Sequence, residues 1–562
     1  MSSSASPSPS SPATSLPAQL TARVQAVTGI DPEMRPATKP QFGHFQSNVA
    51  MRLAKSAGRP PREVAADLVA QLALDDLCEP LEIAGPGFIN FRIKAEVLAT
   101  TAAALIPDEH AGIVPSADPQ RVVIDYSAPN VAKQMHVGHL RSTIIGDCFN
   151  RVLSALGHTV IPQNHIGDWG RQFGMLVEQI LDEDLDPDTL DLEGAEQLYQ
   201  RANAHLKADE DFATASRDRV VKLQAGDPET TAIWRKLINV SLAGFNATYA
   251  RLNVLLTDAD VAGESTYNDD LPIICDDLES RGIAQVDDGA LVVFVEGSQT
   301  PAIIRNQRGG YGYTATDLAA IRHRVGDLES DRIIYVVGSP QQFHFEQVFA
   351  IARRAGYLPD EVAAQFVGFG QVLGADGKKF STREGTAVPL NELLDEANTH
   401  AAPNIALAAI KYADLSSGLQ KDYTFDAERM VQTTGDTGPY LQYAHARINQ
   451  ILRKAEAEAD EAGTPAPGQA ITVLDEPAEQ QLALLLSRFG EVVAEVGDSL
   501  APHKLCNYLY ELAGAYSTFY EHCPVLRSEG EVRESRLGLC RAAKKVLGQG
   551  LYLLGIDAPE RM

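Results

Sequence analysis

The sequence predicts an α/β protein, with a central parallel-sheet domain between a small α+β domain and an all-helical domain. Three observations indicate this. The segment at 122–127, VVIDYS, is apolar and β-branched, as a buried parallel strand is. A helical pattern at about 138–156 and a second strand-like run, TVIPQNHI, follow it and complete a strand–loop–helix–strand unit. From about residue 420 the pattern is helical.

The elements divide the chain into four segments. Residues 1–17 are rich in Ser, Pro and Ala, lack the features of a targeting signal, and are expected to form a disordered tail. Residues 18–115 hold the helix-like stretches AQLTARVQAV and PREVAADLVAQLA around the strand-like GFINFRI. Residues 116–415 hold the parallel sheet, whose returning half begins with RIIYVVG. Residues 416–562 are helical, with a polar interruption at 455–470.

Composition limits the kind of partner. The 562 residues are 44% hydrophobic and 22% charged, and their net charge is −27. This describes a globular, acidic chain and argues against a uniformly basic, nucleic-acid-binding surface. The charge is uneven, because no Lys or Arg lies between Arg171 and Arg201 and no acid lies between Arg536 and Ile556. A nucleic acid would therefore meet selected faces only.

The cysteines and the hydropathy indicate the compartment. Six widely spaced cysteines include no CxxC pair, and no run of 18 apolar residues occurs. We therefore expect no disulfide framework, no zinc ribbon and no transmembrane helix, and a reducing cytoplasm is the simplest location.

The first motif that indicates chemistry is SAPNVAKQMHVGH, where the first central strand leads into its helix. His136 and His139 are three apart and share one side of the first helical turn, and Gly138 permits close backbone approach. Two imidazoles there can donate hydrogen bonds to phosphate oxygens at a helix N-terminus. The alternatives are an ordinary helix start with solvated histidines, or a metal site, which no Cys or acidic cluster accompanies.

The second motif is VLGADGKKFSTREGTAV, a Gly-flanked basic loop about 240 residues later. Lys378, Lys379 and Arg383 can neutralise a triphosphate leaving group, and Ser381 and Thr382 can donate hydrogen bonds to it. The alternative is a solvated surface hairpin.

In this order, the two motifs resemble the HIGH and KMSKS signatures of class I aminoacyl-tRNA synthetases. HVGHLRSTIIGD, NHIGDWGRQFGML, YTATDLAA, DTGPYLQYAHARI and the C-terminal VLGQGLYLLGIDAPERM resemble arginyl-tRNA synthetases in particular. The resemblance covers nearly the whole chain apart from the tail. It implies a Rossmann-like catalytic domain, an N-terminal domain that contacts tRNA, and a helical anticodon-binding domain of the DALR type.

The resemblance also implies an activity. L-arginine would react with ATP, accompanied by Mg²⁺, to give arginyl-adenylate, and the arginyl group would pass to the 3′ end of tRNA(Arg). It implies no structural metal, no membrane, and a monomer. Positioning and electrostatics would supply the catalysis. Catalytic roles fall to His136, His139, Lys133, Lys378 and Lys379, and ATP binding to Pro129, Asn130, His136, Gly138, His139, Lys379, Ser381, Thr382 and Arg383.

One departure from the family pattern concerns the second motif. KMSKS usually ends with a lysine near the position of Thr382, and this chain offers only Lys378 and Lys379. Some arginyl enzymes without that lysine have one just before HIGH, where this chain has Lys133. We therefore predict that Lys133 supplies the missing charge; the alternative is a surface lysine at a loop edge.

The family pattern also implies an arginine pocket. A guanidinium calls for anions and planar acceptors, and Tyr313 and Asp317 would share one helix face. The alternatives are helix caps or surface polar residues. A carboxylate that pairs with the guanidinium rejects analogues, so an editing domain is not required. The predicted pocket residues are Asp125, Asn130, Tyr313, Asp317 and Gln341.

The motif NHIGDWGRQFG is predicted to be a strand end, a tight turn and a helix start. His165, Asp168, Trp169 and Gln172 would face the acceptor end of the tRNA or the adenylate, although Trp169 is equally suited to the core.

Two further regions are predicted to contact tRNA. In FGHFQSN, Phe45 and Gln46 are candidates for base stacking and hydrogen bonding, and His44 replaces the usual acid of the family. In the C-terminal domain the candidates are Tyr440, Tyr443 and Arg447, although tyrosines at helical spacing also suit a core.

Two other classes of function remain to be compared. An HxGH nucleotidylyltransferase would use a pantetheine or nicotinamide nucleotide, but it would not explain the terminal helical domain. A synthetase-like protein without catalysis would bind tRNA or a partner, but the intact HxGH and the lysine-bearing loop argue against it.

Overall fold

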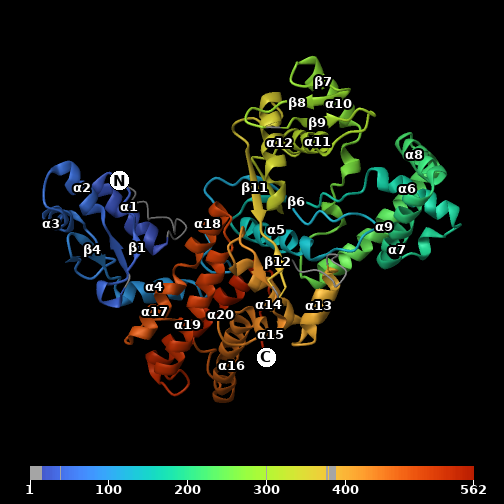
Figure 1. Ribbon diagram of the computed structural model, residues 1–562. Helices are drawn as coiled ribbons and strands as arrows, with labels where there is room; N and C mark the ends of the chain where they lie inside the picture. The colour runs from blue at the N-terminus through green and yellow to red at the C-terminus, as the bar shows by residue number, and fades with distance from the viewer. Residues whose placement is uncertain (1–14, 38, 299, 375–376, 379–387) are drawn as a thin grey trace, which may run out of the picture.

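The computed structural model describes residues 15–37, 39–298, 300–374, 377–378 and 388–562 (Figure 1). The N-terminal part has an antiparallel sheet in the order β1-β2-β4-β3, covered by helices. Its elements are α1 (Leu16–Thr28), β1 (Arg35–Pro36), β2 (Phe45–Ser47), α2 (Val49–Ala57), α3 (Pro61–Gln71), β3 (Glu82–Ala84), β4 (Phe88–Phe91) and α4 (Ala95–Ala104).

The central sheet has four parallel strands in the order β11-β10-β5-β6. Its strands and crossover helices are β5 (Arg121–Asp125), α5 (Val137–Ala155), β6 (Thr159–Gln163), α11 (Tyr313–Gly326), β10 (Arg332–Gly338), α12 (Gln342–Ala355) and β11 (Ala363–Phe369). The predicted α/β fold is confirmed. Pro162 is tolerated because β6 is an edge strand of this sheet.

Alternating side chains place different cores on the two faces of this sheet. Val122 and Ile124 of β5 pack in the same cluster as the buried face of α5. Val123 points to the opposite face and packs with residues of α11 and α12. Strand β10 repeats this pattern, with Val336 on the α5 side and Tyr335 on the α11 side. The two-residue period therefore sets which helices cover which face.

Two insertions separate β6 from β10, and the sequence analysis had assigned neither. The first is helical and comprises α6 (Arg171–Asp182), α7 (Leu192–Ala208), α8 (Glu210–Gln224) and α9 (Pro228–Arg251). The second combines α10 (Asp270–Ser280) with an antiparallel sheet of β7 (Gln285–Asp287), β8 (Ala290–Val293) and β9 (Ala302–Arg305). Figure 1 shows them extending in different directions from the central sheet.

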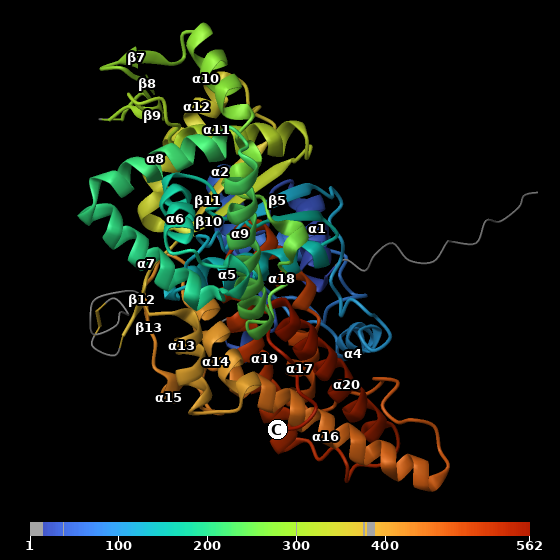
Figure 2. The same cartoon turned by 90° about the vertical axis from the view of Figure 1, so that its right-hand side faces the viewer.

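The C-terminal part is a helical assembly. Its elements are α13 (Leu390–Asn398), α14 (Pro403–Ser416), α15 (Ala427–Met430), α16 (Gly438–Ala462), α17 (Pro477–Leu486), α18 (Phe489–Ser499), α19 (His503–His522) and α20 (Gly530–Leu553). A short parallel pair, β12 (Val372–Leu373) and β13 (Tyr423–Thr424), precedes α15. Figure 2 shows α16 and α20 running together below the central sheet. The N-terminal part meets this assembly where α4 packs against α17 and α20.

The polar interruption in the C-terminal part begins later than the sequence pattern indicated. Helix α16 continues to Ala462, because the Ala- and Glu-rich segment before it has strong helix formers. Gly463 then ends the helix with a left-handed φ of 65°. The boundaries predicted after residues 17, 115 and 415 fall inside α1, in the loop before β5 and near the end of α14, and they stay predictions.

Helix α5 has charged side chains on its buried face. Asp147 accepts hydrogen bonds from Arg151 Nε and from the backbone N–H of Leu255, both at 2.8 Å. Its carboxylate lies 3.9 Å from Nζ of Lys411 on α14. Lys411 also donates to the carbonyl of Gly555, just after α20, at 2.9 Å. This charge junction of Asp147, Arg151 and Lys411 joins α5 of the central sheet to α14 and to the segment after α20.

Burial makes the charge junction sensitive to the loss of one member. Its three side chains are at most 2% exposed, and burial, the largest effect, lowers the pKa of Lys411 to about 8. A buried cation without its counter-ion is far less stable than a solvated one.

We expect Asp147→Asn to destabilise the chain strongly, because it leaves two buried cations without a carboxylate. The expected loss is about 3–5 kcal/mol, measured as a shift of the urea unfolding curve followed by circular dichroism. Asp67→Asn is the matched control, because Asp67 forms an exposed pair with Arg59 at 2.7 Å and its loss should change stability by less than about 1 kcal/mol. Equal shifts for both variants would contradict the prediction.

Candidate active site

The candidate site lies at the carboxyl ends of β5 and β10, where the strand order changes direction. The chain leaves β5 through α5 to β6 on one side, whereas β10 and then β11 lie on the other. In open parallel sheets, ligands bind in the crevice at such a point. The loop 126–136 leaves β5 here, and the segment from Gly338 to Gln341 leaves β10.

The two histidines of the HxGH motif cap α5. Nδ1 of His136 accepts a hydrogen bond from the N–H of Gly138, and Nδ1 of His139 accepts one from the N–H of His136, both at 3.0 Å. The rings stack with their centroids 3.9 Å apart. A side chain at Gly138 would clash, because a Cβ there would lie 2.8 Å from Cε1 of His136. The glycine is therefore required by the ring position.

This geometry assigns the protons on both rings. A nitrogen that accepts from a backbone N–H has no proton of its own, so in the neutral form the proton is on Nε2. Burial, followed by the charges of His136 and Lys133, lowers the pKa of His139 to about 3. His139 is therefore neutral at physiological pH, with Nε2–H as its hydrogen-bond donor.

The loop before α5 holds the other motif residues. Asn130 forms an isolated parallel bridge with Gly167, whose N–H donates to the carbonyl of Pro129 at 3.1 Å. A Cβ on residue 167 would lie 2.5 Å from Oδ1 of Asn130, so this approach requires a glycine. Lys133 extends toward the helical insertion, and its Nζ lies 4.2 Å from the ring centroid of Tyr199 on α7.

The predicted arginine-pocket residues come from three elements. Tyr313 begins α11 and is 78% exposed. Asp317, one turn later, is mostly buried, and its Oδ2 lies within hydrogen-bond distance of Nε2 of His344 on α12, at 2.5 Å. Gln341 is exposed in the short helix η5 (Ser339–Gln341) that follows β10.

Asp125 differs from the others, because a guanidinium of the chain already neutralises it. Its carboxylate accepts from Nη2 of Arg324 at 2.7 Å, and the Arg324 side chain is fully buried. Asp125 at the end of β5 thus neutralises the charge of Arg324 on α11. Oδ2 of Asp125 is therefore already occupied by this ion pair.

Glu264 is a site candidate that the sequence analysis missed. It begins η4 (Glu264–Tyr267), a short helix after the first insertion. Burial raises the pKa of its carboxyl to about 7, and the charges of Asp168 and Asp317 contribute to the same shift. The sequence offers no signal for it, because a single acid between Gly263 and Ser265 resembles any surface turn.

Asp168 is held in place next to Glu264. Its carboxylate accepts hydrogen bonds from the N–H and the hydroxyl of Ser265, at 2.8 and 2.6 Å. Burial raises its pKa as well. Three acids, Asp168, Glu264 and Asp317, thus share a partly desolvated region, which suits a cationic ligand.

The rest of the NHIGDWG segment is mainly structural. Trp169 packs edge-on against Trp234, with 5.6 Å between ring centroids, and Nε1 of Trp234 donates to the carbonyl of Asp168 at 2.8 Å. Gln172 donates to the carbonyl of Trp169. The ring centroids of His165 and Tyr267 are 5.7 Å apart, and the buried Nδ1 of His165 has no hydrogen-bond partner among the described residues.

The second motif is only partly described. Lys378 is exposed, and its carbonyl accepts from the N–H of Gly374 at 2.8 Å. The predicted ligands Lys379, Ser381, Thr382 and Arg383 lie outside the described residues.

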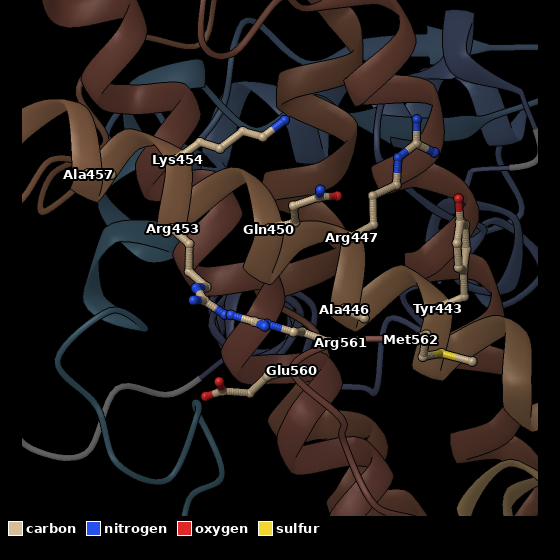
Figure 3. A pocket seen from close by; sticks show the side chains of 10 residues that line it. All are labelled: Tyr443, Ala446, Arg447, Gln450, Arg453, Lys454, Ala457, Glu560, Arg561 and Met562. Carbon is tan, nitrogen blue, oxygen red and sulfur yellow. The ribbon is translucent and has the colours of Figure 1, made fainter. Parts of the chain in front are cut away.

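A basic pocket of about 550 Å³ lies on α16, remote in the sequence from the HxGH motif (Figure 3). Figure 3 shows Tyr443 and Arg447 side by side on α16, with Arg453 and Lys454 farther along it. Arg561 lines the pocket from the chain end. Four cations and one acid, Glu560, line the cavity, so its surface is locally basic on a chain whose net charge is −27.

The predicted tRNA contacts differ in exposure. Tyr443 is 45% exposed. Arg447 stacks over Tyr520, with its Cζ 4.2 Å from the ring centroid. Tyr440 is partly buried, 5.6 Å from Tyr510. In the N-terminal part, Phe45 is 2% exposed and packs in the core, so its ring has no free face for a base.

Neighbours of Phe45 have structural partners. Gln46 donates to Oδ1 of Asn90 at 2.7 Å. Nδ1 of His44 accepts from the N–H of Ile93, and burial lowers the pKa of His44 to about 4.

Within the described ranges, no group of three or more His, Cys, Asp or Glu side chains is arranged to hold a metal ion. Among the same residues, no helix combines the length and apolar character needed to cross a membrane.

Three families match successive parts of the chain. The family described as the arginyl tRNA synthetase N-terminal domain matches residues 14–93. The family described as tRNA synthetases class I (R), catalytic domain, matches residues 101–407, and the DALR anticodon binding domain matches residues 441–562.

Individual proteins agree with this result. An arginine–tRNA ligase of Cutibacterium acnes is 68% identical over 98% of this chain and 100% of its own length. The crystal structure of arginyl-tRNA synthetase from Plasmodium falciparum has a TM-score of 0.82 at 27% identity, covering 97% of this chain and 99% of that one. The Thermus thermophilus arginyl-tRNA synthetase has a TM-score of 0.80 at 26% identity, with coverages of 97% and 100%. The chain belongs to the arginyl-tRNA synthetase family.

Proposed function

We propose that the chain is an arginine–tRNA ligase, which activates L-arginine with ATP to arginyl-adenylate and transfers the arginyl group to the 3′ end of tRNA(Arg). AMP and diphosphate are released. The observation that carries this proposal is the pair of stacked histidines that cap α5 at the switch-point crevice, on a chain that also holds a cluster of three partly buried acids. The histidines can donate hydrogen bonds to the nucleotide phosphates, and the acids can pair with the guanidinium of arginine.

Activation needs stabilisation of the charge that develops on the α-phosphate. The α-carboxylate of arginine attacks this phosphorus, and diphosphate leaves, so negative charge grows on the phosphate oxygens. The Nε2–H groups of His136 and His139 are the donors proposed for these oxygens, at the positive end of the α5 dipole. Because His139 is neutral at physiological pH, its Nε2 carries a proton that it can donate in a hydrogen bond.

Charge compensation at the leaving diphosphate is assigned to lysines. Lys133 has a defined position near the histidines, because its ammonium lies over Tyr199. From the second motif, Lys378 is assigned the same role, and Lys379, Ser381, Thr382 and Arg383, which lie outside the described residues, are proposed to act with it. Mg²⁺ would arrive with ATP, because triphosphate oxygens and one or two carboxylates suffice to bind it.

Arginine recognition is assigned to Glu264 and Asp317, with Tyr313, Asn130 and Gln341 at the edges of the pocket. Burial strengthens a carboxylate–guanidinium pair, which can be bidentate. Asp125 is proposed to contribute through Arg324, which it holds in place beneath the pocket. A lysine or citrulline would leave the buried acids poorly satisfied, so it would be rejected at binding.

The pocket on α16 is proposed to bind the anticodon loop of tRNA(Arg). Tyr443 offers an exposed ring for a base, and Arg447, Arg453, Lys454 and Arg561 can neutralise phosphates.

Arg453→Gln should weaken tRNA(Arg) binding and reduce its salt dependence, with the KM for ATP unchanged. If salt dependence stays the same, Arg453 contacts no phosphate.

We also propose a monomer that acts in a reducing cytoplasm. The six cysteines are all buried and none is paired, which fits a reducing compartment. Sedimentation of the full chain tests the oligomeric state, and a dimer at micromolar concentration would reject this part.

The experiment that tests the proposed reaction is exchange of labelled pyrophosphate into ATP. We expect exchange that depends on arginine and is stimulated by tRNA(Arg). Exchange with pantetheine phosphate or a nicotinamide nucleotide in place of arginine would instead indicate a nucleotidylyltransferase. Binding of tRNA(Arg) without any exchange would indicate a protein without catalytic activity.

Lys133→Ala should slow arginine-dependent exchange by about 10- to 100-fold and raise the KM for ATP. A charge-assisted contact to a phosphate is worth about 1.5–3 kcal/mol, which corresponds to this range. Lys207→Ala is the matched control, since Lys207 is an exposed lysine on α7. If both variants exchange at the wild-type rate, Lys133 does not replace the missing lysine.

The KM for arginine should depend on pH through Glu264. With a pKa of about 7, the carboxyl is charged above pH 7 and protonated below it, so the KM should rise as the pH falls. Between pH 8 and pH 6 a rise of roughly tenfold follows from the linkage. Glu264→Gln should raise the KM at pH 8 and flatten the profile, whereas Glu193→Gln, at an exposed acid on α7, should behave as wild type. An unchanged pH profile in Glu264→Gln would remove Glu264 from the pocket.

A further inference from the structure

The loop between β5 and α5 contains three non-glycine residues with left-handed backbone. Ser127, Ala128 and Ala132 have φ values of 73°, 48° and 59°. In this region the Cβ of an L-residue lies too close to the following carbonyl oxygen. Three such residues among six, next to the histidines, form a strained backbone that other groups must hold.

Side chains from other elements hold all three residues through their backbone N–H groups. The acceptors come from α5, from the segment after β6 and from α9 of the helical insertion. The hydrogen bonds run from Ser127 to Oγ of Ser142 at 2.9 Å, from Ala128 to Oδ1 of Asn164 at 3.1 Å, and from Ala132 to Oγ of Ser241 at 2.9 Å.

A chain of hydroxyl groups adds a second connection between α9 and the loop. Nδ2 of Asn164 donates to the hydroxyl of Tyr249 at 2.9 Å, and that hydroxyl lies 2.8 Å from Oγ of Ser127. Ser127 Oγ is 2.9 Å from Thr143 Oγ1, which donates to the carbonyl of His139 at 2.7 Å. Thr143 Oγ1 has one proton and two acceptors within reach, Ser127 Oγ and the carbonyl of His139, so it links the hydroxyl chain to the first turn of α5.

Burial makes these connections costly to lose. Ser127, Thr143, Asn164, Ser241 and Tyr249 are each at most 3% exposed. Water therefore does not replace a missing partner, and a donor left without an acceptor is unfavourable. The protonated Tyr249 hydroxyl that the network needs is favoured, because burial raises its pKa to about 12.

We propose that Ser241 and Tyr249 of α9 are positioning residues for the activation step: they hold the strained loop that carries Asn130 and Lys133 beside the two histidines. Neither residue is assigned a contact with substrate. The helical insertion thereby acquires a role in activation, through α9. This proposal rests on the proposed function, because Asn130 and Lys133 matter only if arginine and ATP bind there.

The first test compares two neighbouring hydroxyls of α9 in the full chain. Tyr249→Phe breaks the hydroxyl chain, whereas the control Thr248→Val removes a buried hydroxyl that donates within its own helix, to the carbonyl of Gly244. We expect Tyr249→Phe to lower the kcat of arginine-dependent exchange by about tenfold, and Thr248→Val to stay within about twofold of wild type, at similar Tm. Equal kcat values for the two variants would overturn the proposal.

The second test is a rescue. Ser241→Ala should also lower kcat by about tenfold, because Ala132 loses its anchor. Adding Ala132→Gly should restore at least part of the rate, about threefold or more, because glycine adopts positive φ without strain. A double variant no faster than Ser241→Ala would overturn the proposal, and this pair decides the question if Tyr249→Phe does not fold.

The two proposals fail in different ways. A wild-type chain without arginine-dependent exchange refutes the proposed function. A wild-type chain with normal exchange, together with unaffected Tyr249→Phe and Ser241→Ala variants, refutes the positioning role alone.

Discussion

The buried charged side chains of α5 need counter-charges, and helix α14 supplies them across the boundary between the central sheet and the C-terminal helices. Arg141, Asp147 and Arg151 are each at most 3% exposed, and an unpaired charge at such a depth is strongly unfavourable. Their partners lie outside the central sheet. Asp414 of α14 pairs with Arg141, with Nε and Oδ1 3.2 Å apart, and Lys411, on the same helix, completes the charge junction.

This pairing connects the chemistry at one end of α5 with the helices that surround the other. The first turn of α5 holds the histidines, and its later turns contact α14, α18 and α20. Helices α14 and α20 pack against α16, which carries the basic pocket. Separating the catalytic sheet from the C-terminal assembly would therefore expose ion pairs as well as apolar surface. In a single packed body of this kind, the basic pocket on α16 and the histidines at the start of α5 keep a defined relative position.

The sequence predicts best what depends on local pattern. The strand at β5, the helix α5 and the strand β10 follow from periodicity, and the HxGH pair lies at the start of α5 as its spacing indicates. A short motif does not distinguish an exposed aromatic ring from a buried one, so the sequence could not show that Phe45 is buried. Glu264 and Tyr249 could not be found, because the pKa shift of Glu264 arises mainly from burial and the hydroxyl of Tyr249 contacts residues 85 and 122 positions away. The ion pair that occupies Asp125 joins residues 199 positions apart, which no local pattern indicates.

The hydrogen bonds at the start of α5 require an unprotonated Nδ1 on both histidines, which leaves Nε2–H as the donor of each ring. Nitrogen NMR of the full chain with labelled histidine measures the protonation of each ring nitrogen directly, and His136→Asn and His139→Asn variants assign the signals. The account predicts that Nδ1 of both rings is unprotonated at pH 7, and that His139 stays neutral until the pH approaches its pKa of about 3. A His139 ring that becomes charged near pH 6.5, or one that carries its proton on Nδ1 at pH 7, would contradict it.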